Sequence, residues 1–267
     1  LVGSEMCIRD RSLEGTDLDK LALSTEKLLA GTDSKITTIG YYCNPIQYAE
    51  HRKTLENVIC TAGKFGATHV STFAGAWEGK PVESTYEEFG KVFRELADLA
   101  EEKGVKLGIE NCLMDGTWEH ATCNIGFNPK AWEVMFEEVK NDNFGLEWEP
   151  THQMVQLIDP VTELRKWCKK IVHIHGKDAT IDWDAVRHSG ISGAVPFVWH
   201  RMPGFGDTNW RDIISILRSN GYEDDICIEG YHDPVYSGEL EMTGQLHALN
   251  YLKWCRGGDF TPTPWAK

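Results

Sequence analysis

The stretch GLEWEPTHQM (residues 145–154) joins a short strand-like run to charged and imidazole side chains that follow it directly. Strands that are buried on both faces, as in parallel sheets, read as short apolar runs. The segments on either side, PKAWEVMFEEVKN (129–141) and DPVTELRKWCKK (159–170), have apolar residues at helical spacing. The stretch therefore predicts a strand between two helices, with polar residues at the C-terminal end of the strand.

The same alternation runs from residue 17 to the end of the chain. It implies parallel βαβ units, which build either an open doubly wound sheet or a barrel. No G-x-G-x-x-G follows the first strand candidate, and this disfavours a dinucleotide-binding sheet. We therefore predict an α/β fold of the (β/α)8 TIM-barrel type. The strand candidates are residues 35–43, 68–75, 105–112, 144–149, 170–178, 197–202 and 226–232.

The N-terminal stretch LVGSEMCIRDRS (1–12) shows no periodicity and contains GSEMCIRDR, which resembles a translated sequencing adapter. We interpret residues 1–12 as non-native or disordered and residues 13–267 as a single barrel domain. Because a helix candidate precedes the first strand candidate, the barrel is one strand short. We expect the native first strand to be missing, and a genuine seven-stranded or rearranged barrel is the alternative.

Composition restricts the partners of the protein. A net charge of −14 over 267 residues argues against nucleic acid, because nucleic-acid binders need a clustered basic face. The eight cysteines include no Cys-x-x-Cys pair and indicate reduced thiols in a cytoplasmic protein. No apolar run approaches the roughly 18 residues of a membrane span. A small solute is therefore the expected partner.

Five strand candidates carry an ionisable residue at or near their C-terminal ends. In a (β/α)8 barrel, the C-terminal ends of the strands form the active site. Three converging carboxylates would be costly to bury without a cation. Together with one imidazole they suit a divalent ion such as Mn²⁺, Co²⁺ or Mg²⁺, with Zn²⁺ less favoured. The five residues are Glu110, Glu149, His175, Arg201 and Glu229.

The motifs GIEN, EWEPTH, IVHIHGKD, RMPGFGD and CIEG resemble the xylose-isomerase-like barrel superfamily, over about residues 17–260. They are most similar to its sugar phosphate isomerase/epimerase family, which includes ketose 3-epimerases and inosose dehydratases. The resemblance implies one divalent metal, Mn²⁺ first, with the ligands Glu110, Glu149, His175 and Glu229. His175 is preferred to His173 because it stands three residues before Asp178, as in the family pattern H-x-K-D. His173 shares its strand face and would orient a ligand.

The family usually has Asp-Pro-Ser-His where this chain has Glu149, Pro150, Thr151 and His152. Glutamate adds one methylene, so the ligand role of Glu149 is less firmly supported than those of Glu110 and Glu229. Glu147 lies two residues upstream on the same face and competes for this role. The resemblance implies that His152 reaches the substrate.

By the same resemblance, the expected activity is that of a sugar or sugar phosphate isomerase or epimerase. Glu110 and Glu229 would transfer protons through a metal-stabilised enediolate. Two alternatives stay open: a metal-dependent dehydratase of an inosose or keto-acid, and a non-catalytic sugar-binding barrel. The superfamily also contains endonucleases acting on abasic DNA, which the acidic charge disfavours.

A small carbohydrate is the expected substrate. The resemblance implies that His152, Arg201 and Lys177 bind its oxygens. From the residues themselves, Asn111 could bind hydroxyls, and Trp77 or Tyr42 could stack on a sugar, or these side chains could serve packing alone. Residues 179–196 predict a lid or the contact of a homo-oligomer, or an irregular surface loop. The Gly-rich run PGFGDTNW (203–210) could bind phosphate, or its Asp207 or Thr208 could cap a helix.

Overall fold

The computed structural model describes residues 3–7, 16–258 and 261–263, and the side chains of residues 3–7 lie outside the description. The chain divides into two compact units. The first unit runs to Gln153 and adds Lys169–His175 and Asp224–Cys227. The second unit comprises Met154–Cys168, Gly176–Glu223 and the described residues from Ile228 onward. The sequence prediction of a single domain over residues 13–267 stays a prediction.

Within the described part of the chain, the main sheet has seven strands in the order β1-β2-β3-β4-β5-β6-β9. Each neighbouring pair from β1 to β6 is parallel, as the strand–helix alternation predicts. Every residue of β3, β5 and β6 is buried, including the polar side chains that these strands carry. The strands are β1 (Gly3–Cys7), β2 (Lys35–Gly40), β3 (His69–Thr72), β4 (Lys106–Glu110), β5 (Phe144–Trp148), β6 (Ile171–Gly176) and β9 (Ile226–Ile228).

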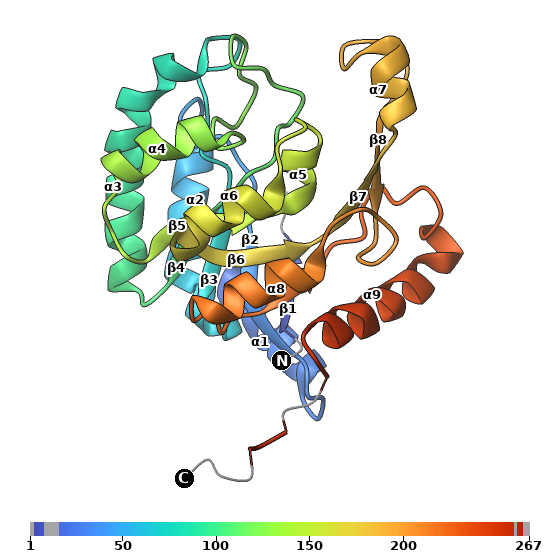
Figure 1. Ribbon diagram of the computed structural model, residues 1–267. Helices are drawn as coiled ribbons and strands as arrows, with labels where there is room; N and C mark the ends of the chain where they lie inside the picture. Colours follow the sequence, from blue (N-terminus) through green and yellow to red (C-terminus); the bar gives the residue numbers. More distant parts are fainter. Residues whose placement is uncertain (1–2, 8–15, 259–260, 264–267) are drawn as a thin grey trace. The chain divides into compact units, whose positions relative to one another are not determined.

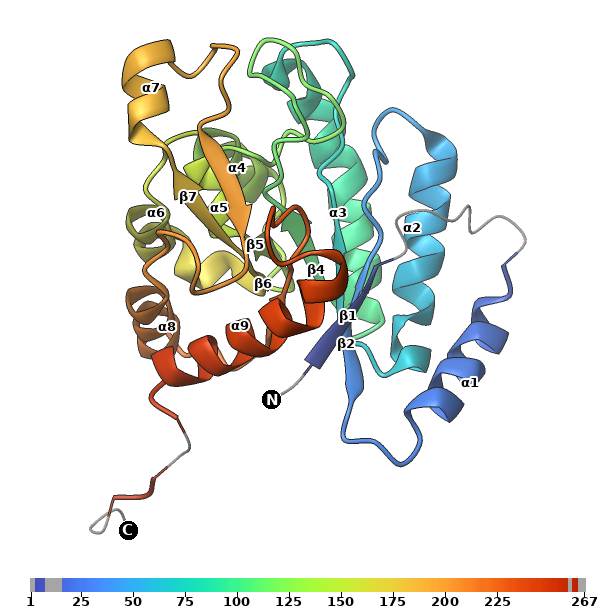
Figure 2. The same cartoon turned by 90° about the vertical axis from the view of Figure 1, so that its right-hand side faces the viewer.

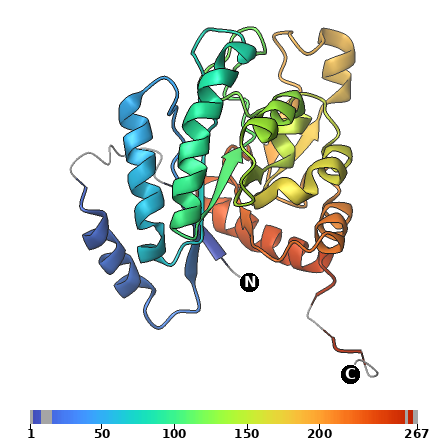
Figure 3. The same ribbon diagram turned by 90° about the vertical axis from the view of Figure 1, so that its left-hand side faces the viewer.

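Helices of the first unit cover the outer side of these strands (Figures 1 and 3). Phe89 and Phe93 on α3 stack on each other at 4.6 Å, and the ring of Phe93 lies 6.0 Å from that of Phe144 on β5. Asp17 and Asn128 cap α1 and α4 by accepting backbone N–H groups. The helices are α1 (Leu18–Leu29), α2 (Ala49–Thr61), α3 (Tyr86–Glu102), α4 (Pro129–Glu138) and the single turn α5 (Pro150–Met154), with 3₁₀ turns at Ala62–Phe65 and Val82–Thr85.

A strand stands at the position where we expected the native first strand to be missing. β1 pairs in parallel with β2, with Gly3 opposite Lys35 and Cys7 opposite Gly40. Backbone groups make the hydrogen bonds of a sheet, so this pairing does not test whether the stretch is native. The interpretation of residues 1–12 as non-native therefore stays a prediction.

β5 and β6 approach each other closely at Gly145. A Cβ atom at this position would lie 2.3 Å from the backbone oxygen of Lys170 and 2.6 Å from Cγ1 of Val172. The register between β5 and β6 also shifts between Leu146 and Glu147, so that Glu147 pairs with His173. Such β-bulges change the direction of side chains and are frequent beside active sites.

The second unit corrects one sequence prediction. We expected residues 197–202 to form a strand of the barrel, but β8 (Val198–Arg201) pairs antiparallel with β7 (Asp178–Ile181) in a separate two-stranded sheet. Neither β8 face is fully buried, unlike the strands of the main sheet. Residues 179–196, predicted as a lid, oligomer contact or surface loop, continue β7 into the short helix α7 (Trp183–Ser189), which lies at the tip of this hairpin (Figure 2).

The remaining elements of the second unit are helical: α6 (Pro160–Trp167), α8 (Trp210–Ser219), α9 (Glu241–Cys255) and 3₁₀ turns at Cys168–Lys170 and Gly238–Leu240. Asn209 caps α8, where the sequence had suggested Asp207 or Thr208. None of the helices in the described ranges is long and apolar enough to cross a lipid bilayer. The cysteines with described side chains stand outside any disulfide: Cys43, Cys60, Cys112, Cys123, Cys168, Cys227 and Cys255.

Candidate metal centre

Three of the predicted metal ligands lie at the C-terminal ends of three adjacent strands of the first unit. Glu110 is the last residue of β4, Glu149 directly follows β5, and His175 lies near the end of β6. Because parallel strands end at the same edge of a sheet, these side chains meet there. Their exposed fractions are 7%, 0% and 4%. The sequence prediction that these side chains share one end of the barrel agrees with their positions.

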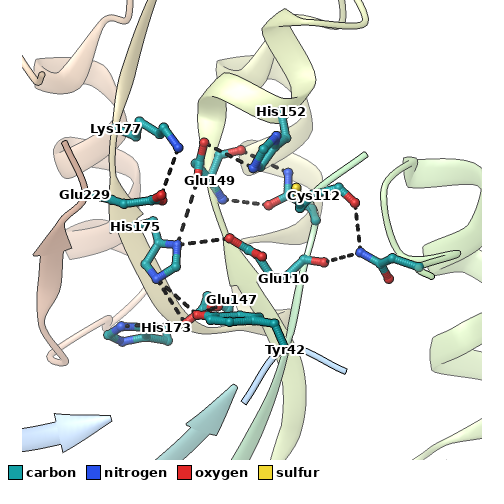
Figure 4. A network of polar contacts seen from close by, with 12 residues as sticks. Tyr42, Glu110, Cys112, Glu147, Glu149, His152, His173, His175, Lys177 and Glu229 are labelled. Carbon is teal, nitrogen blue, oxygen red and sulfur yellow. Dashed lines mark hydrogen bonds and ion pairs between the residues drawn. The ribbon is translucent and has the colours of Figure 1, made fainter. Parts of the chain in front are cut away.

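One ring nitrogen of His175 faces both carboxylates (Figure 4). Its Nδ1 is 3.3 Å from Oε1 of Glu110 and 3.7 Å from Oε2 of Glu149. Each of the three residues offers a ligand atom, and these atoms lie within 4.8 Å of one another. Two carboxylate oxygens and one imidazole nitrogen form a donor set that suits Mn²⁺, Co²⁺ or Zn²⁺. The residues therefore fit the divalent ion that the sequence analysis predicted.

Burial makes this arrangement costly without a cation. Glu149 and Glu110 are nearly inaccessible to water, and their carboxylates converge on the same imidazole. Removing a charged group from water costs several kcal/mol in practice unless opposite charge compensates it. A divalent cation would supply this charge.

Asn111, the residue after β4, makes two hydrogen bonds to the backbone of Glu149. Its side-chain NH₂ donates to the backbone oxygen of Glu149 at 2.9 Å, and its side-chain oxygen accepts from the backbone N–H of Glu149 at 2.7 Å. The Asn111 side chain is fully buried. Both ends of the amide are therefore engaged in positioning a ligand, and the predicted binding of substrate hydroxyls stays a prediction.

His152 belongs to α5, the short helix that Pro150 begins immediately after the strand. Its Nε2 is 3.4 Å from Oε1 of Glu149, and its side chain is about one-tenth exposed. The Glu-Pro-Thr-His motif thus brings an imidazole back to its own carboxylate within one helical turn. This places His152 beside a candidate metal ligand, and its contact with substrate stays a prediction.

Glu229 and Lys177 belong to the second unit and form an ion pair there. Nζ of Lys177 donates to Oε1 of Glu229 at 2.9 Å (Figure 4). Lys177 is buried, whereas the Glu229 side chain is 29% exposed. The lysine therefore holds one carboxylate oxygen of Glu229, where the sequence resemblance had assigned it to substrate oxygens. The ligand and catalytic roles of Glu229 stay predictions.

Arg201 does not end a strand of the main sheet, because β8 belongs to the antiparallel hairpin. Its Nε lies 3.4 Å from Oδ2 of Asp233. Burial alone would raise the pKa of Asp233, but backbone N–H groups of Tyr236, Met202 and Val235 outweigh it and lower that pKa. Arg201 thus pairs with a carboxylate of its own unit, and its binding to substrate stays a prediction.

The Gly-rich run 203–210, for which the sequence left open phosphate binding or a helix cap, is hydrogen-bonded to a carboxylate of the protein. Backbone N–H groups of Gly204 and Thr208 donate to Asp178 at 3.0 and 2.9 Å. Burial raises the pKa of Asp178 despite these hydrogen bonds. The Asp of the H-x-K-D motif therefore holds the Gly-rich loop, and these two N–H groups are engaged within the protein.

Sequence reasoning missed the role of Tyr42, for which it left open stacking on a sugar or packing alone. Its hydroxyl donates to Oε2 of Glu147 at 2.8 Å. Glu147 and His173 share the interior face with Glu149 and His175, as the two-residue spacing within each strand indicates.

Trp77 follows β3 in a loop, where its backbone N–H donates to Thr85, and the role of its ring stays a prediction.

The family model described as a xylose isomerase-like TIM barrel matches residues 4–253. An inosose dehydratase of Clostridium tetani (strain Massachusetts / E88) is 26% identical over 182 residues, covering 66% of this chain and 57% of that protein. An inosose dehydratase of Clostridium perfringens (strain ATCC 13124) is 22% identical over 227 residues, covering 82% and 73%. The matched part therefore spans little more than half of the first of these relatives.

Solved structures show the same fold at low sequence identity. A xylose isomerase domain protein from Planctomyces limnophilus has a TM-score of 0.72 at 17% identity, covering 95% of this chain and 87% of that one. D-psicose 3-epimerase has a TM-score of 0.69 at 15% identity, with 96% and 90% covered. The IOLI protein with a bound zinc atom has a TM-score of 0.64 at 21% identity, with 94% and 86% covered.

Proposed function

The chain belongs to the xylose isomerase-like TIM-barrel family, and we propose that it is a divalent-metal-dependent enzyme acting on a small carbohydrate. The observation that carries this proposal is the buried set of Glu110, Glu149 and His175, whose ligand atoms lie within 4.8 Å of one another at the C-terminal strand ends. In barrels of this kind, that end is the catalytic one. The proposed reaction begins with removal of a proton from a carbon next to a carbonyl.

The metal would be held by Glu110, Glu149 and His175, with Glu229 as the proposed fourth ligand. Carboxylate-rich sets favour Mn²⁺, and the imidazole also suits Zn²⁺, which the IOLI structure contains. When bound, such an ion polarises a carbonyl and stabilises the negative charge that develops when the neighbouring carbon loses its proton.

Two carboxylates would move the protons. We assign this work to Glu110 and Glu229, one removing a proton from the carbon and the other delivering one. Lys177 holds one oxygen of Glu229, so this carboxylate is oriented before substrate binds. His152, next to Glu149, is the proposed hydrogen-bond partner of a substrate oxygen. These steps describe an isomerase or epimerase.

Dehydration is the second candidate function. The two sequence relatives described above are both named inosose dehydratases. A dehydratase would share the first proton removal and then expel a hydroxyl from the next carbon, where an epimerase would return a proton. The metal set serves both reactions, since each needs the charge next to the carbonyl to be stabilised.

The test uses the full chain, stripped with EDTA and reloaded with Mn²⁺ or Zn²⁺, in D₂O with a panel of ketoses, sugar phosphates and inososes. NMR follows deuterium entering the carbon beside the carbonyl. Ultraviolet absorbance follows any conjugated double bond. Deuterated epimer or isomer supports the first candidate, and a conjugated product without its hydroxyl supports the second.

Two variants make the test specific. Glu149→Gln removes a proposed ligand and is expected to abolish turnover. Glu87→Gln changes an exposed carboxylate of α3 that pairs with Lys91 and is expected to behave as the wild type. A wild-type chain that binds neither ion would overturn the proposal, as would full turnover by Glu149→Gln.

A further inference from the structure

We propose that Glu147 is a positioning residue that selects the tautomer of His175 and so directs the Nδ1 lone pair toward the metal centre. The inference rests on the proposed metal function. It assigns to Glu147 a role different from the ligand role that its place beside Glu149 had suggested. Four residues of the first unit carry it: Tyr42, Glu147, His173 and His175.

The two nitrogens of His175 face different carboxylates (Figure 4). Nδ1 lies 3.3 Å from Glu110 and 3.7 Å from Glu149, the two proposed ligands. Nε2 lies 3.3 Å from Oε1 of Glu147. A neutral imidazole carries one proton and one lone pair on its two nitrogens. A carboxylate that accepts the proton of Nε2 therefore leaves the lone pair on Nδ1, facing Glu110 and Glu149.

Glu147 is itself held in place. The hydroxyl of Tyr42 donates to Oε2 of Glu147 at 2.8 Å, and the Tyr42 ring packs on Phe73 at 5.3 Å. The other oxygen, Oε1, faces Nε2 of His175 and, at 3.8 Å, Nε2 of His173. Glu147 is fully buried, and these contacts help to hold its carboxylate in place. Buried carboxylates commonly orient metal-binding histidines in this way.

Glu147, His173 and His175 also offer ligand atoms within 4.8 Å of one another. A second ion at this place would need the Nε2 lone pair of His175. A neutral His175 cannot bind one ion through Nδ1 and another through Nε2, because one nitrogen carries the proton. The positioning role is therefore the better reading of the same contacts, and a second ion becomes an outcome of the test.

The test labels the histidines of the full chain with ¹⁵N and identifies the His175 signals by their loss in His175→Ala. In the Zn²⁺-loaded wild type, long-range ¹H–¹⁵N spectra are expected to show His175 protonated on Nε2, with its Nδ1 bound to the ion. Zn²⁺ titration by calorimetry is expected to show one site per chain. The variants are Glu147→Leu, which removes the acceptor, and Glu147→Gln, whose amide oxygen can still accept.

Glu147→Leu is expected to move the proton of His175 to Nδ1 and to weaken Zn²⁺ binding by about 10- to 100-fold. Glu147→Gln is expected to restore the Nε2-protonated tautomer and most of the affinity. Asp224→Asn is the matched control, because Asp224 also lies beside a buried imidazole, that of His69. This control is expected to leave both the tautomer and the affinity unchanged. Circular dichroism confirms that each variant is folded.

The inference is wrong if a folded Glu147→Leu keeps the wild-type tautomer and affinity. Two Zn²⁺ ions per wild-type chain, falling to one in Glu147→Leu, would also overturn it by making Glu147 a ligand. Failure of the proposed function looks different, because the wild type would then bind no ion. That outcome overturns the inference as well, because no ion then receives the lone pair of Nδ1, whereas normal Zn²⁺ binding with an unaffected Glu147→Leu overturns the inference alone.

Discussion

Histidine lies beside carboxylate at both ends of the parallel strands of the first unit, but the charge balance differs. Near the N-terminal ends, Asp224 meets Nε2 of His69 at 3.6 Å and Nζ of Lys106 at 2.7 Å. This single carboxylate has an imidazole at the start of β3 and an ammonium at the start of β4. The protein supplies the cation itself at this end, which is the pattern of a stabilising contact.

At the C-terminal ends of the strands, carboxylates outnumber the cationic groups. The carboxylates of Glu110, Glu147 and Glu149 all lie within 3.7 Å of the ring nitrogens of His175. Glu110 and Glu147 even stand opposite each other in the β4–β5 register. Like charges directly opposite are destabilising. The comparison teaches that the same residue types make a stabilising contact where charge is balanced, and a candidate cation site where carboxylates are in excess.

The largest effect is expected from Glu149→Gln, which removes charge from the C-terminal end. Metal affinity is expected to fall by more than about 100-fold, beyond the loss typical of residues that only support a ligand. The metal-free variant is expected to be as stable as the wild type or more stable, because one of three converging carboxylates is gone. Calorimetry and urea denaturation in EDTA measure both effects. If Glu149→Gln binds metal as the wild type does, the C-terminal strand ends are not distinguished from the N-terminal ends by a metal site.

Adding metal is expected to stabilise the wild type by about 2.7 kcal/mol at a free concentration of 100 times Kd. The cation completes the C-terminal end only, so Asp224→Asn is expected to gain the same increment. Glu149→Gln is expected to gain little. Thermal unfolding of the three proteins with and without Mn²⁺ measures these increments. Equal increments in all three would place the ion elsewhere.

Asn111→Ala tests the support of the C-terminal end without changing its charge. It removes both hydrogen bonds to the Glu149 backbone. A cost of about 1–3 kcal/mol in unfolding free energy is expected from the buried groups left unpaired, together with roughly 10-fold weaker metal binding. Denaturation and calorimetry on the same sample measure the two effects. If the variant is destabilised but its metal affinity is unchanged, the two hydrogen bonds of Asn111 serve folding alone.

The smallest effect is expected from Asp224→Asn, at about 1 kcal/mol of stability at pH 7, because the pair is partly exposed. The nearby imidazole of His69 lowers the pKa of Asp224, burial opposes this, and Lys106 lowers the pKa further. Because this pKa is lower in the folded state, the ionised carboxylate stabilises the fold at pH values above the ordinary carboxyl pKa of about 4. This contribution to the unfolding free energy is lost as the pH falls below that value. The difference between variant and wild type is therefore expected to be constant above about pH 5 and to shrink below about pH 4. Urea denaturation across this pH range measures the difference in unfolding free energy. A difference that grows as the pH falls would contradict the prediction.

Much of the fold could be predicted because buried parallel strands leave a local signature. The run VKLGIENC (105–112) predicts a strand, and β4 occupies Lys106–Glu110. The run FVWHRM (197–202) also predicts a strand, correctly, but its partner is β7 and not the main sheet. Strand propensity is local, whereas the choice of partner depends on segments distant in sequence.

The residues of the candidate site were likewise predicted only in part. Glu110, Glu149 and His175 were predicted from their positions at strand ends, and they do come together. The roles of Asn111 and Tyr42 could not be predicted, because each acts on a residue 38 or 105 positions away. Such contacts depend on how neighbouring strands are aligned, which no local pattern encodes.

By itself, the sequence determined which chemical groups stand at the ends of which strands. Periodicity and residue type are properties of a short segment, and parallel strands place their ends on one edge. Only the tertiary structure decided that Nδ1 of His175 faces Glu110 and Glu149 while Nε2 faces Glu147. The reason is physical: the register of β5 against β6 shifts between Leu146 and Glu147, and that register sets which atoms meet.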